Sequence, residues 1–211
     1  MEDLILLGIG VHPAELVEII DRVNAARPRW RLVGFLAAPE QKAESDFCGL
    51  PVLGTWREVD RFPDARFLPV AVPGQGTLAL SLGLPRERFA TIIDPSAFVS
   101  RTARLGYGCT FYPHCFVGRN ARIEDFVFSL SGTIINHDDL VESGVCMASG
   151  VNLAGHVHVG RDSYLGAGTL VRQNIRIGAE AFTGMGAVVV KDVPPKTVVA
   201  GNPARILRKL P

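Results

Sequence analysis

Apolar residues recur at every sixth position between Val99 and Pro194, without an insertion or a deletion. The stretch divides into sixteen six-residue units, and fourteen of their sixteen first positions are apolar. The fifth positions are small or β-branched, with Asp139 as the exception. A period of six fits neither the 3.6-residue turn of a helix nor the two-residue alternation of a flat strand. It predicts short strands separated by corners, which is the pattern of a parallel β-helix.

The repeat also predicts which residues lie above one another. Three units complete one coil, so residues eighteen apart stack at the strand spacing of about 4.8 Å. First-position side chains point into the prism, and glycines at many second positions allow tight corners. A prism of this kind exposes three flat faces, on which outward apolar side chains such as Phe126, Phe128, Leu130 and Leu140 would be costly in water.

Residues 1–90 lack the repeat and predict a separate small α/β domain with a parallel, Rossmann-like sheet, followed by the β-helix domain over 91–211. The expected strands are 4–7, 32–36 and 67–72, with helices over 13–26 and near 78–82. Ligands of such sheets bind at the carboxyl ends of the strands. Two glycine turns fall there, one at Gly10 with Val11 and His12, and one at Gly74. A lone GxG turn is weak evidence for a ligand, and shaping a turn is an equal alternative.

Composition narrows the class of protein. A formal charge of +1 argues against nucleic-acid binding. No apolar run is long enough to cross a membrane, and the first one lacks the basic flank of a signal peptide, so no membrane insertion is expected. The four cysteines show no CxxC spacing and suggest reduced thiols in a cytoplasmic protein.

His137 is the strongest candidate for chemistry. It follows Asn136 and precedes Asp138, and a carboxylate beside an imidazole orients the ring and raises its basicity. Adding eighteen to 137 gives Gly155, whose N–H is unobstructed by a side chain and could stabilise an oxyanion. From spacing alone, a solvent-facing corner histidine and an ordinary corner glycine remain open alternatives.

Several segments resemble one family of enzymes. LGYGCT, VGRNAR, VGRDSY, LGAGTL and IGAEAF are similar to the hexapeptide repeat of left-handed β-helix acyltransferases, and VVAGNPARILRKL resembles their C-terminal cap. GIGVHPAE, GLPVLGTWREV, ATIIDPSAFVS and the NHD motif resemble the sugar acyltransferases that include sialic-acid O-acetyltransferases and UDP-amino-sugar N-acetyltransferases. The resemblance implies a homotrimer that acetylates an amino or hydroxyl group of a sugar or nucleotide sugar from acetyl-CoA, in surface glycan biosynthesis.

The resemblance also implies roles for individual residues. His137 would be the general base, Asp138 its support and Gly155 the oxyanion donor. Acetyl-CoA would meet the C-terminal coils, and no metal is expected. The implied cofactor-binding residues are Cys146, Gly155, Ala167, Met185 and Gly186. The implied substrate-binding residues are Gly10, Val11, His12, Gly74 and Asn136.

Two departures from the family pattern keep other functions open. Cys146 stands where a second histidine is common, and a thiol is the poorer hydrogen-bond donor. The acidic residues that usually follow the second strand are missing, which weakens the prediction of a nucleotide. One alternative is a non-catalytic scaffold that binds a sugar nucleotide. The other is a γ-class carbonic anhydrase with three histidines on zinc, although His114, His156 and His158 do not recur by whole coils with His137.

Overall fold

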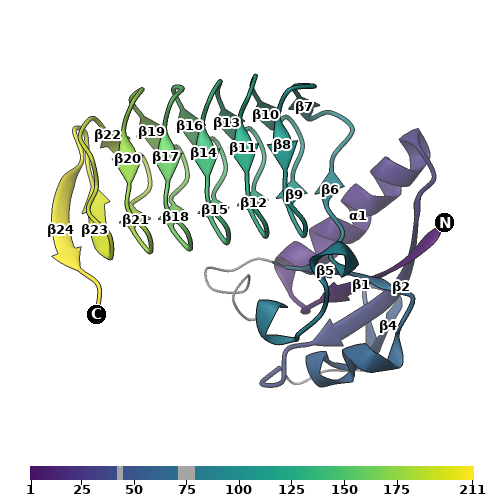
Figure 1. The fold of residues 1–211 in the computed structure, drawn as a ribbon. Helices are drawn as coiled ribbons and strands as arrows, with labels where there is room; N and C mark the ends of the chain where they lie inside the picture. Colours follow the sequence, from purple (N-terminus) through teal and green to yellow (C-terminus); the bar gives the residue numbers. More distant parts are fainter. Residues whose placement is uncertain (42–44, 71–78) are drawn as a thin grey trace.

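The computed structural model describes residues 1–41, 45–70 and 79–211. A small α/β unit is followed by a left-handed parallel β-helix with a short C-terminal cap, so the predicted fold class is confirmed (Figure 1). None of the described helices is long and apolar enough to span a membrane.

The N-terminal unit is a five-stranded sheet in the order β3-β4-β2-β1-β5, with helix α1 against it. Its elements are β1 (Glu2–Leu7), α1 (Val11–Ala26), β2 (Trp30–Ala37), β3 (Asp46–Phe47), β4 (Leu50–Thr55), the 3-10 helix η1 (Trp56–Arg61) and β5 (Arg66–Pro69). Strands β1, β2, β4 and β5 pair in parallel, as predicted for a βαβ pattern. The sequence pattern missed β4, whose interrupting Gly54 and Pro51 weaken the strand signal.

The β-helix consists of two-residue strands on three faces. The apolar face contains β7 (Phe98–Val99), β10 (Phe116–Val117), β13 (Ile134–Ile135), β16 (Asn152–Leu153), β19 (Leu170–Val171) and β22 (Val188–Val189). The basic face contains β8 (Arg104–Leu105), β11 (Arg122–Ile123), β14 (Leu140–Val141), β17 (His158–Val159) and β20 (Arg176–Ile177). The docked face contains β6 (Ile92–Ile93), β9 (Thr110–Phe111), β12 (Phe128–Ser129), β15 (Cys146–Met147), β18 (Tyr164–Leu165) and β21 (Phe182–Thr183), and continues into the cap strands β23 (Thr197–Ala200) and β24 (Arg205–Lys209).

Residues eighteen apart are in register from β6 to β22. Val117, for example, pairs with Val99 on one side and Ile135 on the other. In the last coil the offset falls to sixteen, where Val193 pairs with Ile177 and Val199 with Thr183. First-position side chains such as Val117 and Leu153 are completely buried. The repeat therefore places its apolar column in the interior, as the six-residue period predicts.

The N-terminal unit packs on the docked face, and the two parts share one apolar core. The Phe128 and His12 rings pack edge to face with their centroids 5.3 Å apart, and the Phe126 and Phe89 ring centroids are 5.0 Å apart. Phe126 and Phe128, two of the outward apolar side chains expected to be costly in water, are covered by the N-terminal unit, which leaves 3% and 1% of them exposed. Between α1 and the first coil, Arg22 binds the buried Asp94 through two hydrogen bonds of 2.7 and 3.1 Å.

Candidate active site

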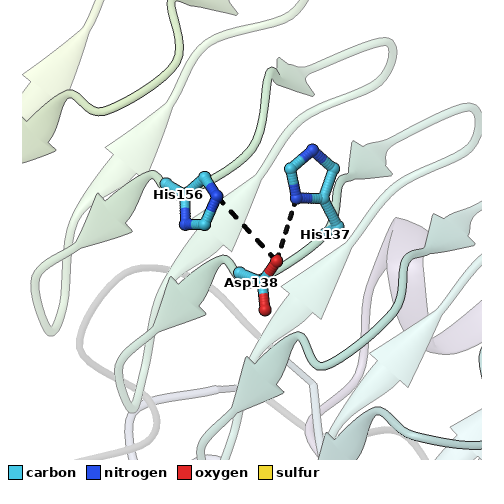
Figure 2. A group of neighbouring side chains, drawn as sticks. All are labelled: His137, Asp138 and His156. Atoms are coloured by element: carbon cyan, nitrogen blue, oxygen red, sulfur yellow. Dashed lines mark hydrogen bonds and ion pairs between the residues drawn. The ribbon is translucent and has the colours of Figure 1, made fainter.

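His137 and Asp138 form the corner between β13 on the apolar face and β14 on the basic face. His137 Nδ1 lies 3.0 Å from Asp138 Oδ2 (Figure 2). Asn120 Nδ2 donates to the other carboxylate oxygen at 3.0 Å. The hydrogen bond with His137, followed by that from Asn120, holds the pKa of Asp138 below its ordinary value. If Nδ1 donates to this carboxylate, Nε2 is left as the acceptor, which is the form of imidazole that can take a proton.

Gly155 lies directly against the His137 ring. A Cβ at this position would come within 2.9 Å of His137 Nε2, and the backbone has φ +96°. In the described part of the chain, the Gly155 N–H donates no hydrogen bond. The structure thus brings together an imidazole nitrogen and a free peptide N–H at one corner, as the eighteen-residue stacking predicts.

His156 is a member of this corner that sequence reasoning did not find. Its ring lies 5.1 Å from the ring of His137, and its Nε2 is 3.9 Å from Asp138 Oδ2. The two histidines do not recur by a whole coil, as the sequence indicates, and their rings are nevertheless neighbours. Residue 156 stacks on residue 138, eighteen positions earlier, so searching the coils above Asp138 as well as above His137 would have found it.

The two residues that flank His137 and Asp138 tie this corner to the next coil. The Asn136 amide donates to Leu153 O at 2.5 Å, which ties the residue before His137 to the next coil. Asp139 points into the prism, where Oδ1 accepts the Val157 N–H at 2.8 Å and Oδ2 has no partner among the described residues. Burial raises the pKa of Asp139 to about 7. Asp139, the one fifth position of the repeat that is neither small nor β-branched, is thus a buried carboxyl two residues from the candidate base.

His137, Asp138 and His156 are also the group of possible metal ligands that the described residues offer. Their ligand atoms all lie within 4.8 Å of one another, and all three residues are exposed. Bonds of about 2.0–2.2 Å place the ligand atoms around zinc roughly 3.4 Å apart, so this arrangement is wider than a preformed site. Two histidines are also one fewer than the carbonic anhydrase alternative needs.

Of the residues expected to bind acetyl-CoA, Gly155 lies at the His137 corner, whereas Ala167, Met185 and Gly186 lie at a different edge of the prism. Ala167 and Met185 stack at the corner between the docked and apolar faces, where Gly186 N–H donates to Ala167 O at 2.8 Å. The Met185 side chain is 80% exposed. Within one chain, the apolar face separates this Ala167 edge from the His137 edge. A single chain therefore does not bring the expected donor site to the expected base.

Cys146 belongs to β15 on the docked face. Its side chain is only 6% exposed, and burial raises the pKa of its thiol to about 12. A thiol with this pKa is protonated near neutral pH and is a weak nucleophile. The structure therefore argues against an acyl-cysteine intermediate at this position.

Gly10, Val11 and His12 lie at the carboxyl end of β1, where α1 begins. Val11 is 73% exposed, and a Cβ on Gly10 would meet no atom within 4 Å, so this turn is open. The Gln41 side chain bridges the turn, accepting from Ile9 N at 3.3 Å and donating to Ile9 O at 2.8 Å. Gly74 lies outside the described residues.

His12 stands between the N-terminal unit and the β-helix. Its Nδ1 lies 3.2 Å from Glu15 Oε2, and the Tyr112 hydroxyl donates to the same carboxylate oxygen at 3.1 Å. Burial is the main reason that the pKa of Tyr112 lies above its ordinary value, and the neighbouring Glu15 carboxylate raises it further. Glu15 thus links His12, at the start of α1, to Tyr112 of the β-helix.

Comparison with curated proteins finds serine acetyltransferases. Serine acetyltransferase 2 of Arabidopsis thaliana is 33% identical over 120 residues, which are 53% of this chain and 36% of that protein. Serine acetyltransferase of Salmonella typhimurium is 30% identical over 146 residues, 64% of this chain and 45% of the relative. The chain thus spans less than half the length of these relatives. No protein-family model matches it.

Solved structures match the chain over almost its full length. The acetyltransferase domain of PglB from Neisseria gonorrhoeae FA1090, in complex with acetyl coenzyme A, is 25% identical with a TM-score of 0.84, covering 98% of this chain and 99% of that one. A histidine-to-asparagine mutant of perosamine N-acetyltransferase from Caulobacter crescentus, in complex with CoA and GDP-perosamine, is 26% identical with a TM-score of 0.81, covering 99% and 98%. The predicted resemblance to β-helix sugar acyltransferases is confirmed.

Proposed function

We propose that this chain, a β-helix protein of the sugar acyltransferase type, transfers the acetyl group of acetyl-CoA to an amino group of a nucleotide-linked sugar. The observation that carries the proposal is the His137 corner, where Asp138 contacts Nδ1 and Gly155 lies against the ring on the Nε2 side. The solved neighbours, which hold acetyl coenzyme A in one case and CoA with GDP-perosamine in the other, support both the donor and the class of acceptor.

The chemistry assigns one task to each residue at the corner. His137 Nε2 accepts a proton from the acceptor amine as its nitrogen attacks the thioester carbonyl carbon. The Gly155 N–H stabilises the oxyanion of the tetrahedral intermediate. Collapse of the intermediate breaks the carbon–sulfur bond, and the imidazolium returns its proton to the departing thiolate of CoA. Asp138 stabilises the imidazolium through Nδ1. The same steps would serve a hydroxyl acceptor, and the perosamine N-acetyltransferase neighbour favours the amine.

The acceptor sugar is proposed to lie against the open turn at Gly10, Val11 and His12. This turn lies at the carboxyl end of β1, the usual place for ligands of a parallel sheet. The N-terminal unit, proposed as the domain over 1–90, would thus bind the acceptor, and the β-helix domain over 91–211 would supply the base. A cytoplasmic location and a role in surface glycan synthesis are part of the same proposal.

A homotrimer would complete the site. The expected donor residues Ala167 and Met185 and the expected base lie on opposite edges of the apolar face. Three chains that turn this face toward a common axis would set the His137 edge of one chain against the Ala167 edge of the next. The outward side chains of the apolar face support burial there, because five of the six are apolar and several are well exposed, including Phe98 at 56% and Leu170 at 46%.

The direct test is acetyl transfer from acetyl-CoA to a panel of GDP-, UDP- and dTDP-linked amino sugars and the matching free sugars. The parent protein should release CoA with one of the nucleotide-linked amino sugars. His137→Ala should lower kcat by at least about 100-fold, the usual worth of a general base. Full activity of this variant would exclude His137 as the base. Binding of a sugar nucleotide without any binding of acetyl-CoA would favour the non-catalytic scaffold.

A further inference from the structure

Four arginines gather on the coils that precede His137. Arg101 and Arg119 occupy the same corner as His137, at eighteen-residue intervals, so they stack below it along the edge. Arg104 and Arg122 are direct partners on adjacent strands of the basic face. All four are exposed. We call this set the arginine cluster.

In the described part of the chain, no member of the arginine cluster forms an ion pair, whereas Arg22, Arg31 and Arg86 each pair with an aspartate. Like charges opposite each other on neighbouring strands destabilise a sheet. Four unpaired guanidinium groups in a chain of net charge +1 therefore concentrate positive charge at one place.

A hollow of about 350 Å³ adjoins two of these arginines. It is lined by Thr102, Arg104, Asn120, Arg122, Asp138, Asp139 and Leu140. The lining thus includes both stacked arginines of the basic face and Asp138, whose carboxylate contacts His137. A ligand in this hollow would place a negatively charged part on the arginines and the adjoining part next to His137.

We propose that the arginine cluster binds the diphosphate of the nucleotide-linked acceptor. Guanidinium groups match phosphate oxygens through paired charged hydrogen bonds, and two of them one strand apart can hold two linked phosphates. This deepens the proposed function and rests on it for the identity of the acceptor. It also supplies a means of holding a nucleotide sugar in a chain that lacks acidic residues after the second strand.

Coenzyme A carries a diphosphate as well, and position along the prism favours the acceptor. The arginine cluster lies on the earliest coils, next to the N-terminal unit, while Ala167 and Met185 lie on later coils toward the cap (Figure 1). In the proposed trimer, the basic face of one chain lies opposite the N-terminal unit of the neighbouring chain. The nucleotide would then be held between that unit and the arginines.

The test is calorimetric titration of the full-length protein with GDP, with UDP and with CoA. The double variant Arg104→Gln with Arg122→Gln should raise the Kd of the nucleoside diphosphate by about tenfold or more, because hydrogen bonds to charged groups are lost. The Kd of CoA should stay within about twofold. Arg161→Gln, at an exposed corner on the far edge of the basic face, is the matched control and should bind the nucleotide as the parent does.

Two further measurements guard against misfolding. Arg122→Lys should keep more of the affinity than Arg122→Gln, since it retains the charge but not the paired geometry. The nucleotide affinity of the parent should also fall more steeply with salt than that of the double variant. A parent that binds neither nucleoside diphosphate would overturn the proposal, as would a double variant with the parent's affinity. A loss confined to CoA would assign the cluster to the donor instead.

These titrations need no turnover, so the two proposals can fail separately. A parent that binds a nucleoside diphosphate through the arginines and transfers no acetyl group would contradict the proposed function alone. An active parent whose nucleotide affinity is unchanged in the double variant would contradict the arginine site alone.

Discussion

Gly155 and His137 approach each other so closely that only a glycine fits above the ring. The contact requires both a positive φ of +96° and the absence of a Cβ, which would lie 2.9 Å from Nε2. A residue with a side chain would have to displace the imidazole or the strand that carries it. The chemistry proposed for this corner therefore depends on a backbone position as much as on the histidine.

We predict that Gly155→Ala lowers kcat by about 100-fold, because the added methyl group displaces Nε2 and obstructs the N–H expected to bind the oxyanion. Gly132→Ala is the control, since Gly132 also has a positive φ of +72° and its Cβ would meet only one atom, at 4.0 Å. Steady-state kinetics with both substrates would check this. Equal losses in the two variants would mean that backbone strain, and not the contact with His137, causes the effect.

Asp139 makes stability depend on pH. Because its pKa is raised to about 7, the folded chain keeps a proton between about pH 4 and 7 that the unfolded chain releases. Stability from this group is therefore full at low pH and falls by about 1.4 kcal/mol per unit as pH rises through that window.

We expect Asp139→Asn to flatten this dependence and to raise the melting temperature by a few degrees at pH 8, where the parent must bury a carboxylate. The amide oxygen can still accept the Val157 N–H. Thermal unfolding from pH 4 to 8 would check it. A parent and variant with parallel pH curves would mean that Asp139 titrates normally.

At the scale of elements, α1 is joined to the first coil by the pair of Arg22 and Asp94. Asp94 is completely buried and also accepts from Ser96 N–H at 2.8 Å and from its hydroxyl at 2.6 Å. Burial works against its charge, but the hydrogen bonds with Arg22 and Ser96 hold the pKa of Asp94 below its ordinary value. This carboxylate therefore links the packing of the N-terminal unit to the start of the β-helix.

Arg22→Ala should lower the free energy of unfolding by about 1–3 kcal/mol, because it leaves a buried carboxylate with fewer partners. Arg31→Ala is the matched control, since its pair with Asp3 is exposed and should contribute less to stability. Melting temperatures of the two variants would measure the difference. Equal shifts would show that the contact with Asp94 contributes no more than a surface pair.

At the scale of the whole molecule, the arrangement of faces predicts a shared active site. Leu170→Glu should introduce three buried charges at the proposed trimer axis and reduce the mass in solution from three chains to one, with loss of transferase activity. Arg161→Glu is the control, because Arg161 lies at the corner between the basic and docked faces, away from the apolar face, and it should leave the mass unchanged. Light scattering of both variants is the measurement. A parent with the mass of one chain would contradict the trimer.

Mixing two inactive variants tests whether the site is composite. His137→Ala lacks the proposed base, and Ala167→Trp would block the proposed donor edge. Trimers reassembled from both should regain part of the activity, because some junctions then combine an intact His137 edge with an intact Ala167 edge from the neighbour. If each site were built from one chain, no junction of the mixed trimers could be active.

The six-residue repeat was enough to predict the β-helix and the stacking of Gly155 on His137, and its absence from the first residues indicated the α/β pattern there. A six-residue period leaves one register, and register alone decides which residues lie above one another. The covering of Phe126 and Phe128 by the N-terminal unit, and the close approach of the His137, Asp138 and His156 side chains, emerged only from the three-dimensional structure. They depend on the docking of the N-terminal unit and on rotamers, which a one-dimensional repeat does not encode.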